Sequence, residues 1–326
     1  MRRAKLPKLN PTPELVYLNR RQFIRQIGAG TATLAAAASI TWPLGCTRAE
    51  TNDTGFNVLT PGLTRPDVLA HFPAPRNERF NFDRPLTDQT VAATHNNFYE
   101  FRPGRAGDLW RLTNEFITDP WTIEVVGQCH KPRKFSVDDI FKLPAEERTY
   151  RFRCVEAWAM DVPWTGFELN RLLKQVEPTA DARFVRFTCV NRPDQMPGLK
   201  QTPHYPWPYF EALRMDEAMH ELTLLVTGVY GRPLPRQHGA PFRIIVPWKY
   251  GYKSPKAIVK IELTEKQPPT FWNTLQPHEY DFLSNVNPHV PHPRWSQATE
   301  RLLGTNDRRP TLFLNGYAND VAKLYT

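Results

Sequence analysis

The segment that decides how this chain is interpreted lies near its middle and reads Arg151-Phe152-Arg153-Cys154-Val155-Glu156-Ala157-Trp158-Ala159-Met160. Cys154 follows basic residues and precedes a carboxylate at Glu156. A nearby positive charge lowers the pKa of a thiol and favours the thiolate, the form that binds metals. Thiolate is a soft ligand that suits a polarisable metal centre. An isolated cysteine is more often a buried structural residue, however, and the spacing alone favours that role.

We expect the same segment to be a strand. In extended backbone, residues two apart point to the same face. Phe152, Cys154 and Glu156 then share one face, and Arg151 and Arg153 lie on the other. This arrangement limits direct contact between the arginines and the thiol.

The charge of the chain is concentrated at its N-terminus. The net charge is +9, but eight of the 42 Lys and Arg and two of the 33 Asp and Glu lie in residues 1–50, which leaves +3 for the rest. A nearly neutral body offers no broad basic surface to a polyanion, so nucleic acid is not an expected partner. A chain of 326 residues can bury a large core and form one large domain or two.

Residues 1–49 are predicted to be an export signal. Arg20 and Arg21 precede large apolar residues and Arg25, and the uncharged, Ala-rich run 27–44 follows. This pattern is typical of the twin-arginine route, which exports folded proteins, and it predicts a periplasmic location. The alternative is a membrane anchor, for which 18 mainly small residues are marginal. The cleavage site stays open, because no clean Ala-x-Ala ends the run and Cys46 hints at a lipoprotein signal.

The body of the chain mixes strands and short helices. Residues 50–90 are rich in Pro, Asn, Thr and Asp and are predicted to form an irregular arm, followed by one catalytic domain over 91–326. No regular strand–helix repeat and no Gly-rich nucleotide loop is present, so the predicted fold class is α+β with a strand-rich core. Strands are predicted at 119–127, 183–190, 222–229 and 244–246, and helices after Ser136, at 169–176 and at 210–219.

A second informative block covers residues 237–256. Arg243, Lys249, Lys253 and Lys256 lie within 14 residues and alternate with aromatic residues. Arginine binds phosphate through two hydrogen bonds and lysine binds it as a point charge. The block therefore predicts a phosphate site, with a solvated basic loop as the alternative.

Several long motifs resemble one enzyme family. The strongest resemblance is carried by two runs, Arg-Cys-Val-Glu-Ala-Trp at 153–158 and Val-Pro-Trp-x-Gly-Phe at 162–167. Together they resemble the molybdenum-ligating segment of periplasmic protein-methionine-sulfoxide reductase catalytic subunits. That family belongs to the sulfite oxidase group of molybdopterin enzymes. Asn-Asn-Phe-Tyr-Glu-Phe at 96–101 and segments at 285–288, 293–301 and 314–318 are also similar to that family. The resemblance covers roughly residues 90–326 and implies a sulfite oxidase-like, molybdopterin-binding domain.

The resemblance implies a set of site residues. Cys154 is the implied metal ligand, and the implied contacts to molybdopterin are Asn96, Tyr99, Glu100, Cys189, His238, Arg243, Ser254, Pro255 and Lys256. Three positions depart from the family pattern. Cys189 stands where a threonine is common and His238 where Asn is frequent, while Pro255 replaces a flexible apolar residue and has no N–H to donate. Cys189 is also open to interpretation as a buried inert thiol.

The implied activity is reduction of methionine sulfoxide in oxidised exported proteins by oxygen-atom transfer at molybdenum. Releasing the oxygen as water needs protons, which makes Glu156 a candidate catalytic acid, although a structural carboxylate is an equal alternative. The chain has no CxxCH motif for a c-type haem, and the resemblance implies a membrane haem-b subunit as electron donor. The alternatives are a sulfite or nitrate oxidoreductase of the same fold and an exported pterin-binding protein without turnover.

Overall fold

The computed structural model describes residues 57–81, 84–104 and 106–326. The predicted twin-arginine signal and its cleavage site lie outside these residues. The compact unit that follows begins at Thr54 and continues to Thr326. Among the described residues, no helix combines the length and the apolar character needed to cross a membrane.

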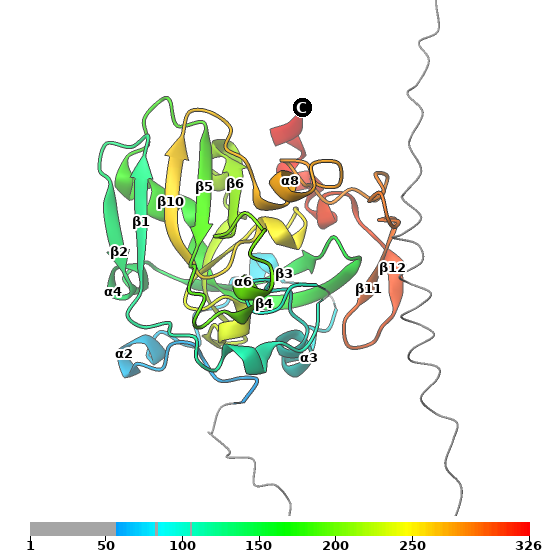
Figure 1. Cartoon of the computed structure of the whole chain (residues 1–326), viewed down its shortest axis with the longest axis horizontal. Helices are drawn as coiled ribbons and strands as arrows, with labels where there is room; N and C mark the ends of the chain where they lie inside the picture. Colours follow the sequence, from blue (N-terminus) through cyan, green and yellow to red (C-terminus); the bar gives the residue numbers. More distant parts are fainter. Residues whose placement is uncertain (1–56, 82–83, 105) are drawn as a thin grey trace, which may run out of the picture. The chain divides into compact units, whose positions relative to one another are not determined.

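Within the described residues, the strands form two sheets (Figure 1). The five-stranded sheet has the order β2-β1-β10-β5-β6, and the seven-stranded sheet has the order β12-β11-β4-β7-β8, with β3 paired to β4 and β9 to β7. The strands are β1 (Thr122–Gly127), β2 (Arg133–Ser136), β3 (Glu146–Arg153), β4 (Trp158–Glu168), β5 (Phe184–Cys189), β6 (Phe210–Arg214), β7 (Leu224–Val229), β8 (Arg232–Pro233), β9 (Arg243–Ile245), β10 (Ile258–Thr264), β11 (Thr299–Leu302) and β12 (Arg308–Pro310).

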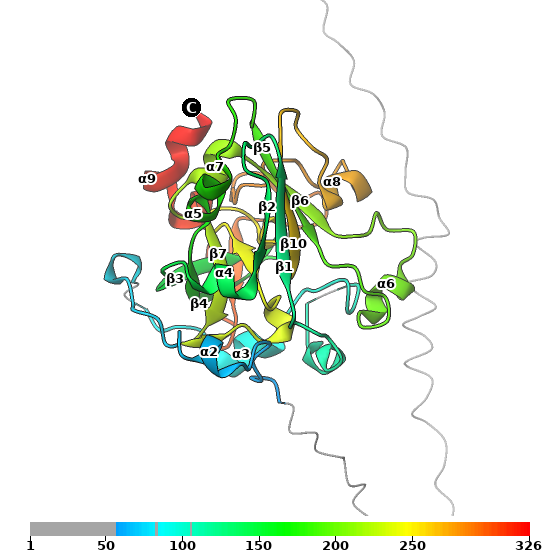
Figure 2. The ribbon, with the colours of Figure 1, turned by 90° about the vertical axis from the view of Figure 1, so that its left-hand side faces the viewer.

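The helices are short and connect or cover the sheets (Figure 2). The α-helices are α2 (Pro66–Leu69), α3 (Gln89–Thr94), α4 (Val137–Phe141), α5 (Leu169–Leu173), α6 (Pro197–Gln201), α7 (Met215–Met219), α8 (Phe271–Leu275) and α9 (Ala318–Val321). The 3-10 helices are η1 (Glu78–Phe80), η2 (Trp110–Thr113), η3 (Lys174–Val176), η4 (Arg236–His238), η5 (Gly251–Lys253), η6 (Phe313–Gly316) and η7 (Ala322–Tyr325).

One buried hydrophobic cluster includes residues of both sheets. Val185 and Phe187 of β5 and Val162 of β4 all belong to it and are fully buried. Strand β5 alternates between buried and half-buried positions, as expected for a strand with one face on the core. Strand β4 is buried at ten successive positions, because β3 and β7 pair with its two edges and both of its faces are covered. The predicted α+β class is confirmed.

Most of the predicted elements are present. Strands β1, β5 and β7 lie within the predicted ranges, and β9 begins and ends one residue before its predicted range of 244–246. Ser136 caps α4 through a capping box with Asp139. The helix predicted over 210–219 is wrong in its first half. Phe210–Arg214 forms β6, which pairs with β5 from Thr188 to Phe184, and only Met215–Met219 is helical. Pairing at the sheet edge outweighs the local preference of these residues. The predicted boundary between the arm and the catalytic domain stays a prediction.

Candidate active site

Cys154 lies in a tight turn between β3 and β4. The turn is closed by two backbone hydrogen bonds, from Cys154 N to Trp158 O (2.9 Å) and from Ala157 N to Cys154 O (3.0 Å). Ala157 adopts a left-handed backbone conformation with φ of 64°. The prediction of continuous extended backbone through Cys154 is therefore wrong, because β3 ends at Arg153. The turn nevertheless brings Cys154 and Glu156 together, since Glu156 N donates to Cys154 Sγ over 3.5 Å.

The thiol of Cys154 is shielded from water. The residue is 6% exposed, and burial, followed by the charge of Glu156, raises its pKa to about 12. The Arg153 guanidinium donates to Cys154 O, Glu300 Oε2 (3.0 Å) and Gln297 Oε1 (2.8 Å), and its charge lowers the pKa of the thiol by less than burial raises it. Burial thus raises the thiol pKa by more than the neighbouring basic residues, which were expected to lower it, can offset. A thiol of this kind becomes a thiolate when a metal cation replaces its proton.

Asn97 is the side chain that contacts the Cys154 sulfur from outside the turn. Its Nδ2 donates to Cys154 Sγ (3.6 Å) and to Glu156 Oε2 (3.3 Å). Trp158 Nε1 donates to the same Glu156 oxygen over 3.2 Å. The neighbouring Asn96 was predicted to contact molybdopterin, and its amide donates to Ala93 O at the end of α3 (2.7 Å). The contact of Asn96 with the cofactor stays a prediction.

Half-buried and buried aromatic side chains lie within electrostatic range of Cys154. The ring of Tyr99 contacts Trp272 of α8 edge-on at 4.9 Å between centroids, and Trp272 contacts Tyr280 at 5.2 Å. Burial raises the pKa of Tyr99, and the charges of Glu156, Tyr280 and Cys154 add to this effect. The structure therefore brings the predicted site residues Tyr99, Cys154 and Glu156 together.

Three basic side chains form a second group, which we call the cationic cluster and define as His238, Arg243 and Lys256. Arg243 is 1% exposed, and its guanidinium donates to His238 O (2.9 Å) and Ser254 O (3.2 Å). Burial lowers the pKa of Arg243 to about 9. Burial and the charges of Arg243 and Lys256 lower the pKa of His238 to about 3. Within the described chain, Arg243 forms no ion pair with a carboxylate.

Lys256 joins the cluster because the backbone packs closely at Gly239. Gly239 has φ of 95°, and a Cβ at this position would lie 2.5 Å from Lys256 Cβ, so glycine is required. Burial and Arg243 lower the pKa of Lys256 to about 8, against the opposing effects of Glu100, Cys189 and Cys154. Lys256 is therefore within electrostatic range of Arg243 and of Cys154.

Glu100 and Cys189 lie next to Lys256. Cys189 ends β5, opposite Ile258 of β10, and its sulfur accepts the backbone N–H of Lys256. Burial, followed by the charge of Glu100, raises the pKa of Cys189. Burial raises the pKa of Glu100 to about 7. The structure therefore places Cys189 within the predicted site, although its sequence position departs from the family pattern.

Ser254 and Pro255 shape the loop mainly through their backbones. Ser254 O accepts from Arg243, Ser254 Oγ accepts from Val246 N (3.1 Å), and Pro255 O accepts from Ile244 N (3.0 Å). The missing N–H of Pro255 is therefore compatible with the loop, which uses the carbonyl of this residue.

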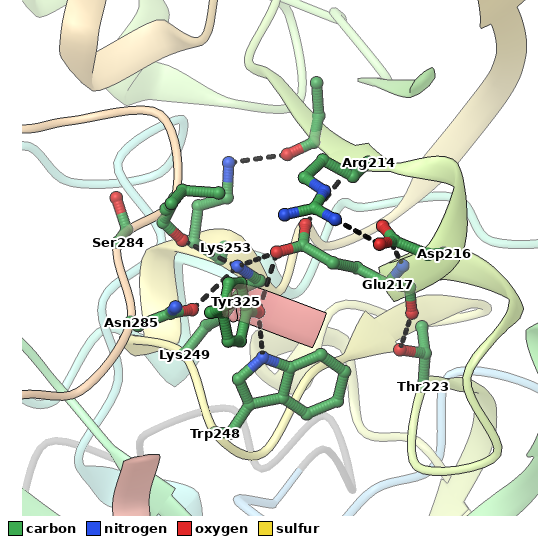
Figure 3. A network of polar contacts seen from close by, with 12 residues as sticks. Arg214, Asp216, Glu217, Thr223, Trp248, Lys249, Lys253, Ser284, Asn285 and Tyr325 are labelled. Carbon is green, nitrogen blue, oxygen red and sulfur yellow. Dashed lines mark hydrogen bonds and ion pairs between the residues drawn. The ribbon is translucent and has the colours of Figure 1, made fainter. Parts of the chain in front are cut away.

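Lys249 and Lys253 do not belong to the cationic cluster, so the prediction of a four-residue phosphate site is wrong for them. Lys249 Nζ contacts Glu217 Oε1 (2.6 Å) and also donates to Leu283 O and Asn285 Oδ1. Figure 3 shows this buried network, in which Tyr325 Oη also donates to Glu217 (2.7 Å). Lys253 Nζ lies 2.7 Å from Glu211 Oε2. These carboxylates are distant in sequence, which is why the pattern of basic residues did not exclude the two lysines.

The chemistry of the donors fits a molybdopterin with a phosphate group. The cationic cluster buries positive groups without a matching set of carboxylates, an arrangement that an anion would stabilise. His238 Nδ1, His95 Nε2 and Asn97 Oδ1 are buried atoms without a hydrogen-bond partner in the described structure. Buried polar atoms are normally paired, so these three mark space for a polar group. The sulfur of Cys154 is a soft donor of the kind that suits the metal.

One protein family and two known proteins are similar to this chain. A family described as the oxidoreductase molybdopterin binding domain matches residues 111–272. The chain is 46% identical over 326 residues to the protein-methionine-sulfoxide reductase catalytic subunit MsrP of Burkholderia mallei (strain ATCC 23344), and the match covers 98% of this chain and 93% of that protein. The crystal structure of the sulfane dehydrogenase SoxCD from Paracoccus pantotrophus shares 13% identity, covers 86% of this chain and 67% of that chain, and has a TM-score of 0.44.

The match to the Burkholderia protein extends over nearly the full length of both chains. The chain therefore belongs to the family of protein-methionine-sulfoxide reductase catalytic subunits, which are oxidoreductases with a molybdopterin-binding domain.

Proposed function

We propose that this chain is the molybdenum-dependent catalytic subunit that reduces methionine sulfoxide in exported proteins and thereby repairs oxidative damage. The observation that carries the proposal is the environment of the buried Cys154 sulfur, which contacts Asn97 and Glu156 and is within electrostatic range of Lys256 in the cationic cluster. This arrangement provides a soft metal ligand and an anion-binding group in one site.

The chain's own residues have separable roles in this proposal. Arg243 and Lys256 bind the phosphate of the pterin, and His238 offers its unpaired Nδ1 to the same cofactor. Cys154 holds the metal through its sulfur. When bound, molybdenum-molybdopterin supplies oxygen-atom transfer and two-electron redox chemistry. Reduction of one sulfoxide consumes two electrons and two protons and yields the thioether and one water.

Glu156 is the proposed proton donor for that water. Its carboxylate accepts hydrogen bonds from Asn97 Nδ2 and Trp158 Nε1, which fix its position two residues from the ligand. It forms no ion pair within the described residues, so the alternative of a salt-bridged structural carboxylate finds no partner there. A positioned carboxyl group beside the reacting centre can transfer a proton directly or through one water.

The proposal includes a location and a partner. The name of the Burkholderia relative describes a catalytic subunit, which indicates that such a chain works with another subunit. We assign the supply of electrons to a membrane haem-b subunit and the location to the periplasm, reached by twin-arginine export. Changing Arg20 and Arg21 to Lys is expected to retain the protein in the cytoplasm, as measured by fractionation, and efficient export of this variant would contradict the assignment.

The activity is tested by reductant-driven turnover on methionine sulfoxide and on an oxidised protein, with molybdenum and pterin measured on the same samples. Cys154→Ser is expected to lose turnover while it retains pterin, because an alkoxide is a harder and more basic ligand than a thiolate. Cys129→Ser is the matched control and is expected to keep its activity, since Cys129 is partly exposed and lies outside the site. A loaded protein that oxidises sulfite but does not reduce sulfoxides would refute the proposal. An active Cys154→Ser variant with unchanged molybdenum spectroscopy would refute the assigned ligand.

A further inference from the structure

The Asn97 side chain connects the two reactive groups of the Cys154 turn. One amide nitrogen lies 3.6 Å from Cys154 Sγ and 3.3 Å from Glu156 Oε2. The only other hydrogen bond to the sulfur in the described structure comes from Glu156 N, within the turn itself (3.5 Å). Asn97 is thus the side-chain donor that the fold brings to this sulfur from a distant segment.

The carbonyl end of the same amide is unpaired. Asn97 Oδ1 is buried and has no hydrogen-bond partner in the described structure. A purely structural asparagine would normally use both ends of its amide, as buried polar groups are nearly always paired. Asn96 shows the contrast, because its amide donates to Ala93 O and its backbone pairs with Gly107.

A hydrogen bond to a ligand sulfur changes the metal to which the sulfur is bound. The donor withdraws electron density from the thiolate and stabilises the reduced metal relative to the oxidised one, so reduction potentials depend on such bonds. The groups that orient a ligand can affect metal affinity and activity nearly as much as the ligand itself.

We propose that Asn97 is a positioning residue that tunes the Cys154 ligand through its amide N–H and holds Glu156 beside it. The inference rests on the proposed function, because it requires Cys154 to bind the metal. Asn97 itself transfers neither oxygen nor electrons. Its amide raises the reduction potential of the metal and keeps the carboxylate within reach of the reacting centre.

Two variants of Asn97 and one control separate this role from general stability. Asn97→Leu removes the donor at similar size, and Asn97→Asp keeps the shape but replaces the donor with a negative acceptor. Trp158→Phe removes the second donor to Glu156 and leaves the donor to the sulfur in place. The measurement is the midpoint potential of the molybdenum in the loaded protein, from a redox titration followed by electron paramagnetic resonance, together with molybdenum and pterin content.

The expected result is a negative shift of the midpoint potential in Asn97→Leu, a larger negative shift in Asn97→Asp and little change in Trp158→Phe. Loss of molybdenum with retained pterin in the Asn97 variants would also support the proposal, because it locates the defect at the ligand. Wild-type potentials in both Asn97 variants would overturn it, as would loss of metal and pterin together, which indicates a defect in folding or pterin binding. Cys154→Ser separates failure of the proposed function from failure of the inference on Asn97. If Cys154→Ser leaves the molybdenum signal unchanged, the proposed function fails. If Cys154→Ser alters the signal while both Asn97 variants leave it unchanged, only the inference on Asn97 fails.

Discussion

The buried pair of Lys249 and Glu217 gives the sharpest test of what holds the site loop in place. Lys249 Nζ lies 2.6 Å from Glu217 Oε1, and the two side chains are 0% and 1% exposed. Burial alone would raise the pKa of Glu217, but Lys249 and the hydrogen bond from Tyr325 outweigh it and hold the pKa below its usual value. The carboxylate is therefore charged and depends on Lys249.

Lys249→Met removes the cation and leaves this carboxylate buried. Tyr325 Oη and Arg214 N still donate to Glu217, but no positive charge replaces the ammonium. Removing one partner of a buried ion pair costs about 3–5 kcal/mol. For a domain of this size each kcal/mol lowers the melting temperature by about 2–4 °C, so the expected loss is about 6–20 °C.

The matched control is Lys131→Met. Lys131 also pairs with a glutamate, Glu177, but these side chains are 64% and 49% exposed. Exposed pairs contribute at most about 1 kcal/mol, so this melting temperature is expected to fall by less than about 4 °C. The assay is thermal unfolding of the loaded protein followed by circular dichroism. Equal losses in the two variants would refute the argument that burial makes the Lys249 pair essential.

Two further predictions concern the site. Arg243→Ala is expected to lose most of its bound pterin, measured after purification, while Arg243→Lys keeps part of it because lysine binds phosphate as a point charge. Substitution of the half-buried Arg186 by Ala is the control. Full pterin content in Arg243→Ala would remove Arg243 from the site. Ala157→Gly is expected to raise the melting temperature by a few degrees, because the left-handed backbone conformation costs a residue with a Cβ roughly 1–2 kcal/mol and glycine avoids most of this cost. The control Ala159→Gly in β4 should instead lower the melting temperature. A lower melting temperature in Ala157→Gly would contradict the claim that Ala157 is strained.

The sequence identified the parts of the site that are local in the chain. The Ser136 cap, the alternating strand β5 and the apolar face of α5 depend on residues within a few positions of one another, so their patterns predict them directly. The motif around Cys154 also predicted Cys154 and its neighbour Glu156 as site residues together, and the turn places them in contact.

The turn at Cys154 was not predictable from local preference. Its fourth residue is Ala157, which lacks the freedom of glycine, and no Asn-Gly or Asp-Gly pair marks the turn. The conformation is imposed by pairing on both sides, since β3 and β4 form a hairpin and Arg301 N from β11 donates to Ala157 O (2.8 Å). Strain at such a position is sustained only when the surrounding structure fixes it.

The loop from Arg243 to Lys256 shows why counting charges along a sequence does not locate a binding site. It carries four basic residues, which differ in whether the fold places a carboxylate against them. Lys249 and Lys253 face Glu217 and Glu211, so their charges are cancelled inside the protein and anchor the loop.

The charges of Arg243 and Lys256 are not cancelled in this way. Glu100 is the carboxylate that acts on Lys256, and burial raises the pKa of Glu100 to about 7. The uncompensated charge of the loop is thus carried by Arg243 and Lys256, the two residues that we propose bind the phosphate of the pterin. Anchoring and binding are carried by different residues of one loop, and their substitutions should therefore differ in effect. Loss of an anchoring residue lowers stability and cofactor content together. Loss of a binding residue lowers cofactor content alone. Without cofactor, that variant should be at least as stable as the unsubstituted chain, because burying an unpaired cation is itself costly.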